Sequence, residues 1–325
     1  MPDTASSQLR PPPRTPIALH SFAVLLAGAT LALIFVGGLV TSTGSGLAVP
    51  DWPLSFGQFF PRMVGGVFYE HGHRMAAATV GALTLALALW TWLVDTHRIV
   101  RRLALTAVGT VVAQGLLGGL TVIFLLPPAI SVAHACLAQA FLCLAITLAV
   151  ITHPDWTPAT HPPADARLAR LTVATAATVY GQLVLGAIMR HTGAGLAIPD
   201  FPLAFGHILP PLDSSAVVIH FLHRMGAVVV TTMVTWSAVR VLRTRGSDRS
   251  LLRPAFVALG LVATQLTLGA LTIWTRKAVL PTTAHVAVGA AILGTTVVLA
   301  LRARRAPSAA SRSQTPFLAT ERVPA

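Results

Sequence analysis

The sequence predicts an all-α polytopic membrane protein, with eight transmembrane helices arranged as two tandem four-helix bundles related by a pseudo-twofold along the membrane normal. Three observations carry this prediction. The chain has 54% apolar and only 10% charged residues, it contains eight apolar runs long enough to cross a bilayer, and it repeats itself after about 150 positions. Soluble domains carry about 25% charged residues, so the composition argues against a soluble enzyme. A chain this apolar also cannot be disordered.

Each apolar run is interpreted as a helix, because about 20 apolar residues span the hydrocarbon core and lipid offers the backbone no hydrogen-bond partner. The first run could be a signal peptide, but it is longer than a usual signal-peptide core. Its end, around Gly37, also matches the end of the fifth run, around Gly186, so we expect a permanent helix. In chain order, the predicted spans are Leu19–Val40, Tyr69–Val94, Leu103–Leu125, Ser131–Thr152, Leu168–Met189, Ser214–Leu242, Pro254–Thr275 and Thr282–Arg302.

A tandem duplication groups these spans into two sets of four. Residues 43–61 read TGSGLAVPDWPLSFGQFFP and residues 192–210 read TGAGLAIPDFPLAFGHILP, with 12 of 19 positions identical. Further along, His73-Arg74 recurs as His223-Arg224 after 150 positions, and His134 recurs as His285 after 151. Because each repeat holds an even number of spans, both repeats insert with the same orientation.

The positive charge predicts the orientation of the chain. The formal net charge is +13, which alone could indicate a nucleic-acid partner, but the arginines gather in short gaps between apolar runs. Such clusters face the cytoplasm in membrane proteins. We therefore expect a multi-pass protein of the cell inner (plasma) membrane with both termini cytoplasmic, a lipid bilayer as its surroundings and no nucleic-acid partner. Segments 41–67 and 190–213 would face outward, although Arg276-Lys277 on the outer side opposes the rule locally.

The domain boundaries follow from the repeat. We expect a flexible cytoplasmic N-terminus, an N-terminal repeat, a cytoplasmic linker, a C-terminal repeat and a flexible cytoplasmic tail rich in Ser, Ala and Pro. These segments are residues 1–17, 18–152, 153–167, 168–303 and 304–325.

Four histidines are the candidate metal ligands. His73, His134, His223 and His285 each lie in the first turns of an even-numbered span, and each is matched in the other repeat. Even-numbered spans all run in the same direction, so the four side chains lie at one depth near the outer face. Ionisable residues inside a membrane are costly and usually functional. Interhelical hydrogen bonding is the alternative role.

A histidine pair in each repeat suits haem better than a bare metal ion. Zinc sites usually need three or four protein ligands, whereas haem iron needs only axial ligands beyond its four ring nitrogens. Two repeats then imply two haem sites. Arg74 and Arg224 follow the first histidine of each pair and could bind haem propionates. Each could instead extend toward the membrane surface.

The repeats differ at one position beside the histidines. Glu70 lies three residues before His73, on the same helix face, whereas His220 takes the equivalent position before His223. The carboxyl group of Glu70 could transfer protons or stabilise a developing cation. Pairing with Arg74 or Arg62 is the alternative role of Glu70.

These features together resemble haem A synthase, a family of cytochrome oxidase assembly proteins. The resemblance rests on Glu70-x-x-His73-Arg74, on the matched histidines and on the Gly-Leu-Ala-x-Pro-Asp-x-Pro-Leu loop, and it covers roughly residues 18–303. It implies an oxidoreductase that converts haem O to haem A by oxidising a ring methyl to a formyl group. The N-terminal half would hold the substrate haem and the C-terminal half a haem b cofactor, with Glu70 as the catalytic acid.

The resemblance also implies the partners: haem O, an electron donor, and as candidates haem O synthase and cytochrome oxidase subunit I or its assembly factors. Some members of the family carry a cysteine pair in the first outer loop, whereas residues 41–67 contain no cysteine. The alternative functions are a membrane di-haem b electron carrier and a haem-binding assembly factor without catalysis. A transporter, which parallel repeats also allow, would bind no haem.

Overall fold

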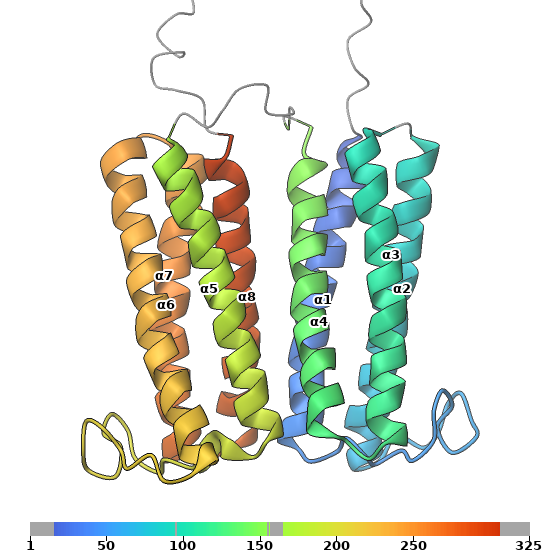
Figure 1. Ribbon diagram of the computed structural model, residues 1–325. Helices are drawn as coiled ribbons and strands as arrows, with labels where there is room; N and C mark the ends of the chain where they lie inside the picture. Colours follow the sequence, from blue (N-terminus) through green and yellow to red (C-terminus); the bar gives the residue numbers. More distant parts are fainter. Residues whose placement is uncertain (1–15, 95, 155, 157–164, 306–325) are drawn as a thin grey trace, which may run out of the picture. The chain divides into compact units, whose positions relative to one another are not determined.

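The computed structural model describes residues 16–94, 96–154, 156 and 165–305, and in this part of the chain it is all-α (Figure 1). Its only other regular features are one short 3₁₀ turn, Ala194–Leu196, and two isolated β-bridges in the loops that precede α2 and α6. The all-α prediction is therefore confirmed. The helices are α1 Ile17–Ser42, α2 Gly66–Leu93, α3 Arg98–Ile123, α4 Pro128–Ile151, α5 Ala166–His191, α6 Ser215–Arg245, α7 Arg249–Trp274 and α8 Val279–Ala303.

All eight predicted spans are helices that are long and apolar enough to cross a membrane. Several begin earlier or end later than hydropathy predicts, and in α3, α6 and α7 the added turns carry arginines. The third span, expected from Leu103, begins at Arg98. There the Arg101 guanidinium lies over the Trp92 ring, 5.3 Å from its centroid. Such a contact lets a charged side chain remain helical at the membrane boundary.

Helix α7 begins at Arg249 rather than at Pro254, so the proline lies inside the helix. Proline has no N–H, and the carbonyl of the residue four positions earlier loses its helical partner. That carbonyl belongs to Ser250, and it accepts a hydrogen bond from Arg302 Nη1 at 2.9 Å. An interhelical bond from α8 thus replaces the missing one, and the helix continues past the proline.

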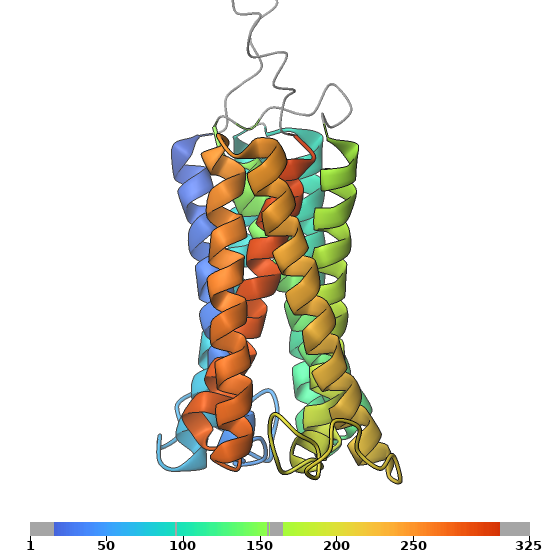
Figure 2. The same cartoon turned by 90° about the vertical axis from the view of Figure 1, so that its left-hand side faces the viewer.

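The chain divides into two compact units, one holding α1–α4 and the other α5–α8. Within each unit, every helix packs against the next one, and the first helix also packs against the fourth. Figure 2 views the second unit from the side, with α6 and α7 in front and the loop that precedes α6 below them. Each unit is therefore a four-helix bundle whose diagonal pairs, α2 with α4 and α6 with α8, face each other across its centre.

The pseudo-twofold between the bundles stays a prediction. The expected flexible N-terminus, linker and tail fall largely on residues 1–15, 157–164 and 306–325, outside the described residues.

The buried core of the first unit lies toward the end remote from the long loops. Leu19, Leu26, Leu87, Phe141 and Leu148 form its centre, and alanines of α3 complete it. The outward faces of the helices are also apolar, so burial from water does not distinguish inside from outside in a membrane. Close packing of side chains, with alanines among them, therefore holds the bundle together at this end. The polar side chains lie at the other end, around the histidines.

Candidate functional site

The four predicted histidines lie near the start of their helices, at the end of each unit where the long loop enters. His73 is on α2, His134 on α4, His223 on α6 and His285 on α8, and all four are partly buried. In the second unit, the rings of His223 and His285 lie 6.4 Å apart between centroids, with an angle of 64° between their planes. The diagonal helices of this bundle thus bring the predicted ligand pair together at its centre.

A glycine on the neighbouring odd-numbered helix makes room for each histidine ring. A Cβ atom added at these glycines would lie 2.9 to 3.2 Å from Cε1 of the ring, closer than ordinary contacts allow. The backbone of one helix therefore borders the imidazole of the next. The pairs are Gly37 with His73, Gly118 with His134, Gly186 with His223 and Gly269 with His285.

Glutamine side chains hold three of the histidines. Gln114 Nε2 donates to the His134 carbonyl at 3.0 Å and lies 3.4 Å from its Nε2 atom, and the matched Gln265 lies 3.3 Å from Nε2 of His285. Gln182 donates to the carbonyl of His223 at 2.8 Å and lies 3.1 Å from its Nδ1 atom. At the position equivalent to Gln182, the first repeat has a leucine, residue 33. The two units therefore support their first histidine differently.

The donor set of two imidazoles in each unit fits a haem, whose ring would supply the other ligands of the iron. In the second unit the two imidazoles, His223 and His285, lie with their ring centroids 6.4 Å apart. Nδ1 of His73, His134 and His285 is buried without a hydrogen-bond partner. Among the described residues, no group of three or more His, Cys, Asp or Glu side chains could hold a bare metal ion. The imidazole pairs thus suit a metal whose other ligands come from a macrocycle.

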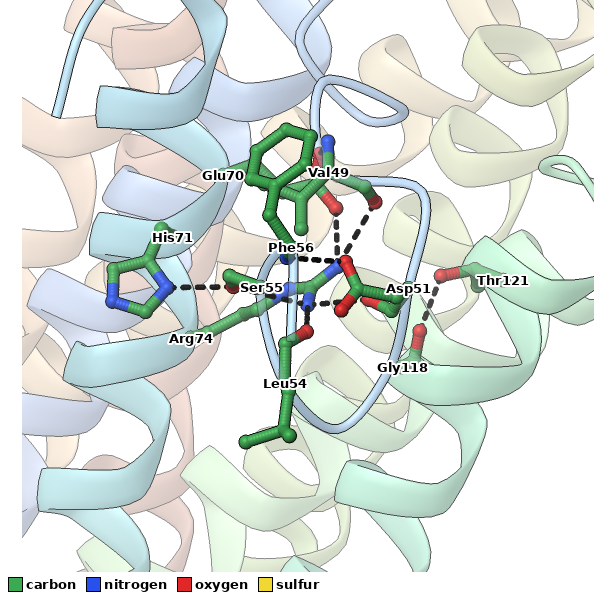
Figure 3. Close-up of polar contacts among 10 residues, drawn as sticks. All are labelled: Val49, Asp51, Leu54, Ser55, Phe56, Glu70, His71, Arg74, Gly118 and Thr121. Carbon is green, nitrogen blue, oxygen red and sulfur yellow. Dashed lines mark hydrogen bonds and ion pairs between the residues drawn. The ribbon is translucent and has the colours of Figure 1, made fainter. Parts of the chain in front are cut away.

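Arg74 holds the loop between α1 and α2 against the end of its bundle (Figure 3). Its Nη1 donates to the carbonyl oxygens of Asp51 and Leu54, both at 2.8 Å, and its Nη2 donates to the carbonyl of Val49 at 3.2 Å. The loop therefore closes over the helix end through one guanidinium.

Arg224 makes the same contacts in the second unit. It donates to the carbonyls of Leu203, Asp200 and Ile198 at 2.7, 2.6 and 3.3 Å. Both predicted propionate ligands thus hold loop carbonyls, and Nε of Arg224 is buried without a hydrogen-bond partner. Their role toward propionates stays a prediction.

The aspartate of each loop fixes a tight turn. Asp51 accepts hydrogen bonds from the backbone N–H groups of Gly57 at 2.8 Å and Phe56 at 2.7 Å, and Asp200 repeats this arrangement. Phe56 and Gly57 both have positive φ, 54° and 70°, which is unfavourable for a side-chain-bearing residue such as Phe56. The two N–H bonds, Gly57 first, hold the pKa of Asp51 below its usual 3.8.

Glu70 and His220 occupy the same place and accept the same kind of hydrogen bond. Glu70 Oε2 accepts from the Val49 N–H at 2.8 Å, and Nδ1 of His220 accepts from the Ile198 N–H at 3.2 Å. Both side chains are buried, 4% and 3% exposed. Only Glu70 carries a carboxylate, and its Oε1 forms an ion pair with Nη2 of the nearby arginine at 2.7 Å (Figure 3). The pairing foreseen with Arg74 is therefore present.

Sequence reasoning missed His71. Its Nδ1 is hydrogen-bonded to Ser55 Oγ at 2.8 Å, and both side chains are buried (Figure 3). The second repeat has Phe221 and Ala204 at these positions, where they pack in an apolar cluster. A comparison of the repeats for polar residues lacking a match would have found the pair. The first unit therefore holds a polar network beside Glu70 that the second unit lacks.

Comparisons with known proteins identify the family of the chain. Residues 63–297 match the COX15-CtaA family, described as cytochrome oxidase assembly protein. The chain is 31% identical over 258 residues to a haem A synthase of Halalkalibacterium halodurans, covering 78% of this chain and 86% of that protein. It is 30% identical to that of Geobacillus kaustophilus, over 86% and 91% of the two chains. It is 33% identical to that of Symbiobacterium thermophilum, over 77% and 84%.

We expect Gly186→Ala to destabilise the second unit, because the new methyl group would displace the His223 ring. Overpacking of this kind costs about 1 to 3 kcal/mol, seen as a lower melting temperature in detergent. The matched control is Gly181→Ala on the same helix, where a Cβ would meet nothing within 4 Å. If both variants melt at the same temperature, the glycine does not provide the space for the ring.

Because Asp51 fixes the turn, we expect the stability of the loop to depend on pH. The pKa of Asp51 is lowered on folding, so its contribution to loop stability is complete above pH 3.8 and is lost as the pH falls through the lowered folded value. Limited proteolysis of the purified protein should leave loop 43–65 intact from neutral pH to about pH 4, and cleave it faster in Asp51→Ala at every pH. Cleavage of Asp51→Ala at the wild-type rate at neutral pH would contradict this role.

Proposed function

The chain belongs to the COX15-CtaA family of cytochrome oxidase assembly proteins, and on this premise we propose that it is the oxidoreductase that converts haem O to haem A. The observation that carries the proposal is the family match over residues 63–297, which spans the histidine pairs of both repeats. The relatives named haem A synthase are aligned over most of their own length, so the activity is assigned to the whole chain rather than to one unit.

The two histidine pairs are the proposed haem sites. His73 and His134 would hold the substrate haem O, and His223 and His285 a resident haem b. The 6.4 Å spacing of the second pair and the glycine beside each ring support this assignment. When bound, the substrate haem presents the ring methyl that is oxidised to a formyl group, and the haem b supplies electron transfer.

Glu70 is the proposed catalytic residue of the first unit. It is buried, and it has a fixed position because Val49 N–H and Arg74 each hold one of its oxygens. A carboxylate held in this way can accept a proton, and the resulting carboxylic acid can return it, without a change in position. The second unit has a histidine at this place, consistent with a division of labour between a reactive site and an electron-transfer site.

The first proposed role of Arg74 and Arg224 is to position the loops. Arg74 and Arg224 tie each loop to its helix, which limits access of water to the proposed haem sites. The buried Nε of Arg224, which has no hydrogen-bond partner, supports a further contact with a propionate in the second unit. The same contact is proposed for Arg74 in the first unit.

The surroundings follow from the helices and the arginine pattern. Eight membrane-length apolar helices make the protein a multi-pass membrane protein. We place it in the inner membrane with both termini cytoplasmic, because the arginine-rich connections between α2 and α3 and between α6 and α7 are separated by an even number of spans and would face the same side. Its partners would be an electron donor and, as candidates, haem O synthase and cytochrome oxidase subunit I or its assembly factors.

Variants of Glu70 test the proposed activity. In cells supplied with haem O, the wild-type protein should yield haem A or its hydroxylated precursor on pigment extraction. Glu70→Ala, Glu70→Gln and Glu70→His should retain bound haem but lose conversion by at least about 100-fold, the usual contribution of a positioned acid or base. Glu70→His is the sharpest variant, because His220 shows that an imidazole accepts the loop N–H at this place. Normal conversion in Glu70→His would remove Glu70 from the chemistry.

Variants of the histidines test the two sites separately. His73→Ala and His223→Ala should each lower the haem content of the purified protein by one equivalent, and only the first should abolish binding of added haem O. Absorption spectra and pigment extraction measure both quantities. A protein loaded with haem that forms no oxidised product would instead indicate an assembly factor or electron carrier, and a colourless protein would overturn the haem sites altogether.

A further inference from the structure

A second candidate site lies in the α5–α8 unit, at the end remote from the histidines. A cavity of about 510 Å³ opens between the first turns of α5 and the last turns of α6. Its walls combine three arginines with apolar side chains. The lining residues are Arg167, Arg170, Leu171, Ala174, Met233, Trp236 and Arg240.

The charged end of the cavity is set up to receive an anion. Arg240 Nη2 lies 3.0 and 3.1 Å from the two carboxylate oxygens of Asp165, which also caps α5 by accepting the Leu168 N–H. That contact orients Arg240, while its Nε is buried without a hydrogen-bond partner. Arg167 and Arg170 add two more positive charges against the single carboxylate of Asp165. Guanidinium groups match phosphate geometry closely.

The remaining walls of the cavity are apolar and extend along the axes of α5 and α6. Ala174 lies seven residues beyond Arg167 on α5, about 10 Å along the helix. Met233 and Trp236 line the facing side on α6. Trp236 is 57% exposed, as is common for tryptophan near the headgroup level of a bilayer. The cavity thus has a cationic end and an apolar end, and it matches a ligand with an anionic headgroup and an apolar chain.

The first repeat has aromatic side chains at the equivalent place. By the repeat offsets, Phe22 takes the place of Leu171 and Trp90 that of Arg240, and their rings pack edge to face with centroids 5.7 Å apart. An alanine and a serine, residues 18 and 21, replace the other two arginines. The four-helix fold therefore forms without these three arginines, so they are not required by the architecture.

We propose that this cavity binds an anionic phospholipid, with the phosphate of the headgroup on the three arginines and an acyl chain along Leu171, Ala174 and Met233. Basic pockets between transmembrane helices on the cytoplasmic side recognise such headgroups, and the arginine pattern places this end of the unit there. The site is separate from the histidines, so its test is independent of the proposed oxidation of haem O.

The test measures lipid retained by the purified full-length protein. Protein extracted from bilayers of equal phosphatidylglycerol and phosphatidylcholine is washed with detergent, and bound lipid is quantified by mass spectrometry. The wild type should retain phosphatidylglycerol at least about fivefold over phosphatidylcholine. The double variant Arg167→Gln/Arg170→Gln, which leaves the Asp165–Arg240 pair intact, should lose this preference.

A matched control distinguishes lipid binding in the cavity from a general effect of positive charge at this end of the unit. Arg243→Gln/Arg249→Gln removes two exposed arginines from the same end of the unit, outside the cavity lining, and should retain the lipid like the wild type. Equal loss in both double variants, or equal retention of the two lipids by the wild type, would overturn the proposal. Displacement of the lipid by millimolar inorganic phosphate would also overturn it, because the site would then bind a free anion. A melting temperature in detergent equal to that of the wild type verifies that each variant is folded.

Discussion

The close contact between each histidine ring and a glycine of the adjacent helix is the constraint on which both bundles depend. Four such contacts recur, and in each the space that a Cβ atom would fill is occupied by Cε1 of an imidazole. In a membrane, helices gain little from hiding apolar surface, so close approach of backbones decides how they pack. Glycine on the odd helix and histidine on the even helix thus set the bundle spacing and place the donor atoms at its centre.

Duplication gives both units the same loop architecture with different side chains in it. The arginine that holds the loop, the aspartate that forms its turn and the residue that accepts the loop N–H are present in both units. At the last of these places one unit has Glu70 and the other His220, and the hydrogen bond to the loop survives the exchange. Because both side chains accept the loop N–H, the chemical difference between the two units at this place is the carboxylate of Glu70.

Further divergence lies in side chains that have no match. His71 and Ser55 form a buried polar pair in the first unit, where the second has an apolar cluster. The second unit in turn has an arginine-lined cavity, and the first unit has the aromatic pair Phe22 and Trp90 at matched positions of its wall. A buried polar pair costs free energy unless its hydrogen bonds are satisfied. Such departures from the repeat are therefore good indicators of where each unit has acquired its own function.

The amino-acid sequence alone determined the eight helices, the duplication and the four histidines, because span length and repeat register are properties of the chain itself. It also pointed to Glu70 and to the arginines beside the histidines. Only the tertiary structure decided that Arg74 holds loop carbonyls, that Glu70 accepts the Val49 N–H, and that α7 passes through Pro254 with help from Arg302. These contacts join residues some 20 to 50 positions apart, and hydropathy and spacing carry no information on where a folded loop returns to its helix.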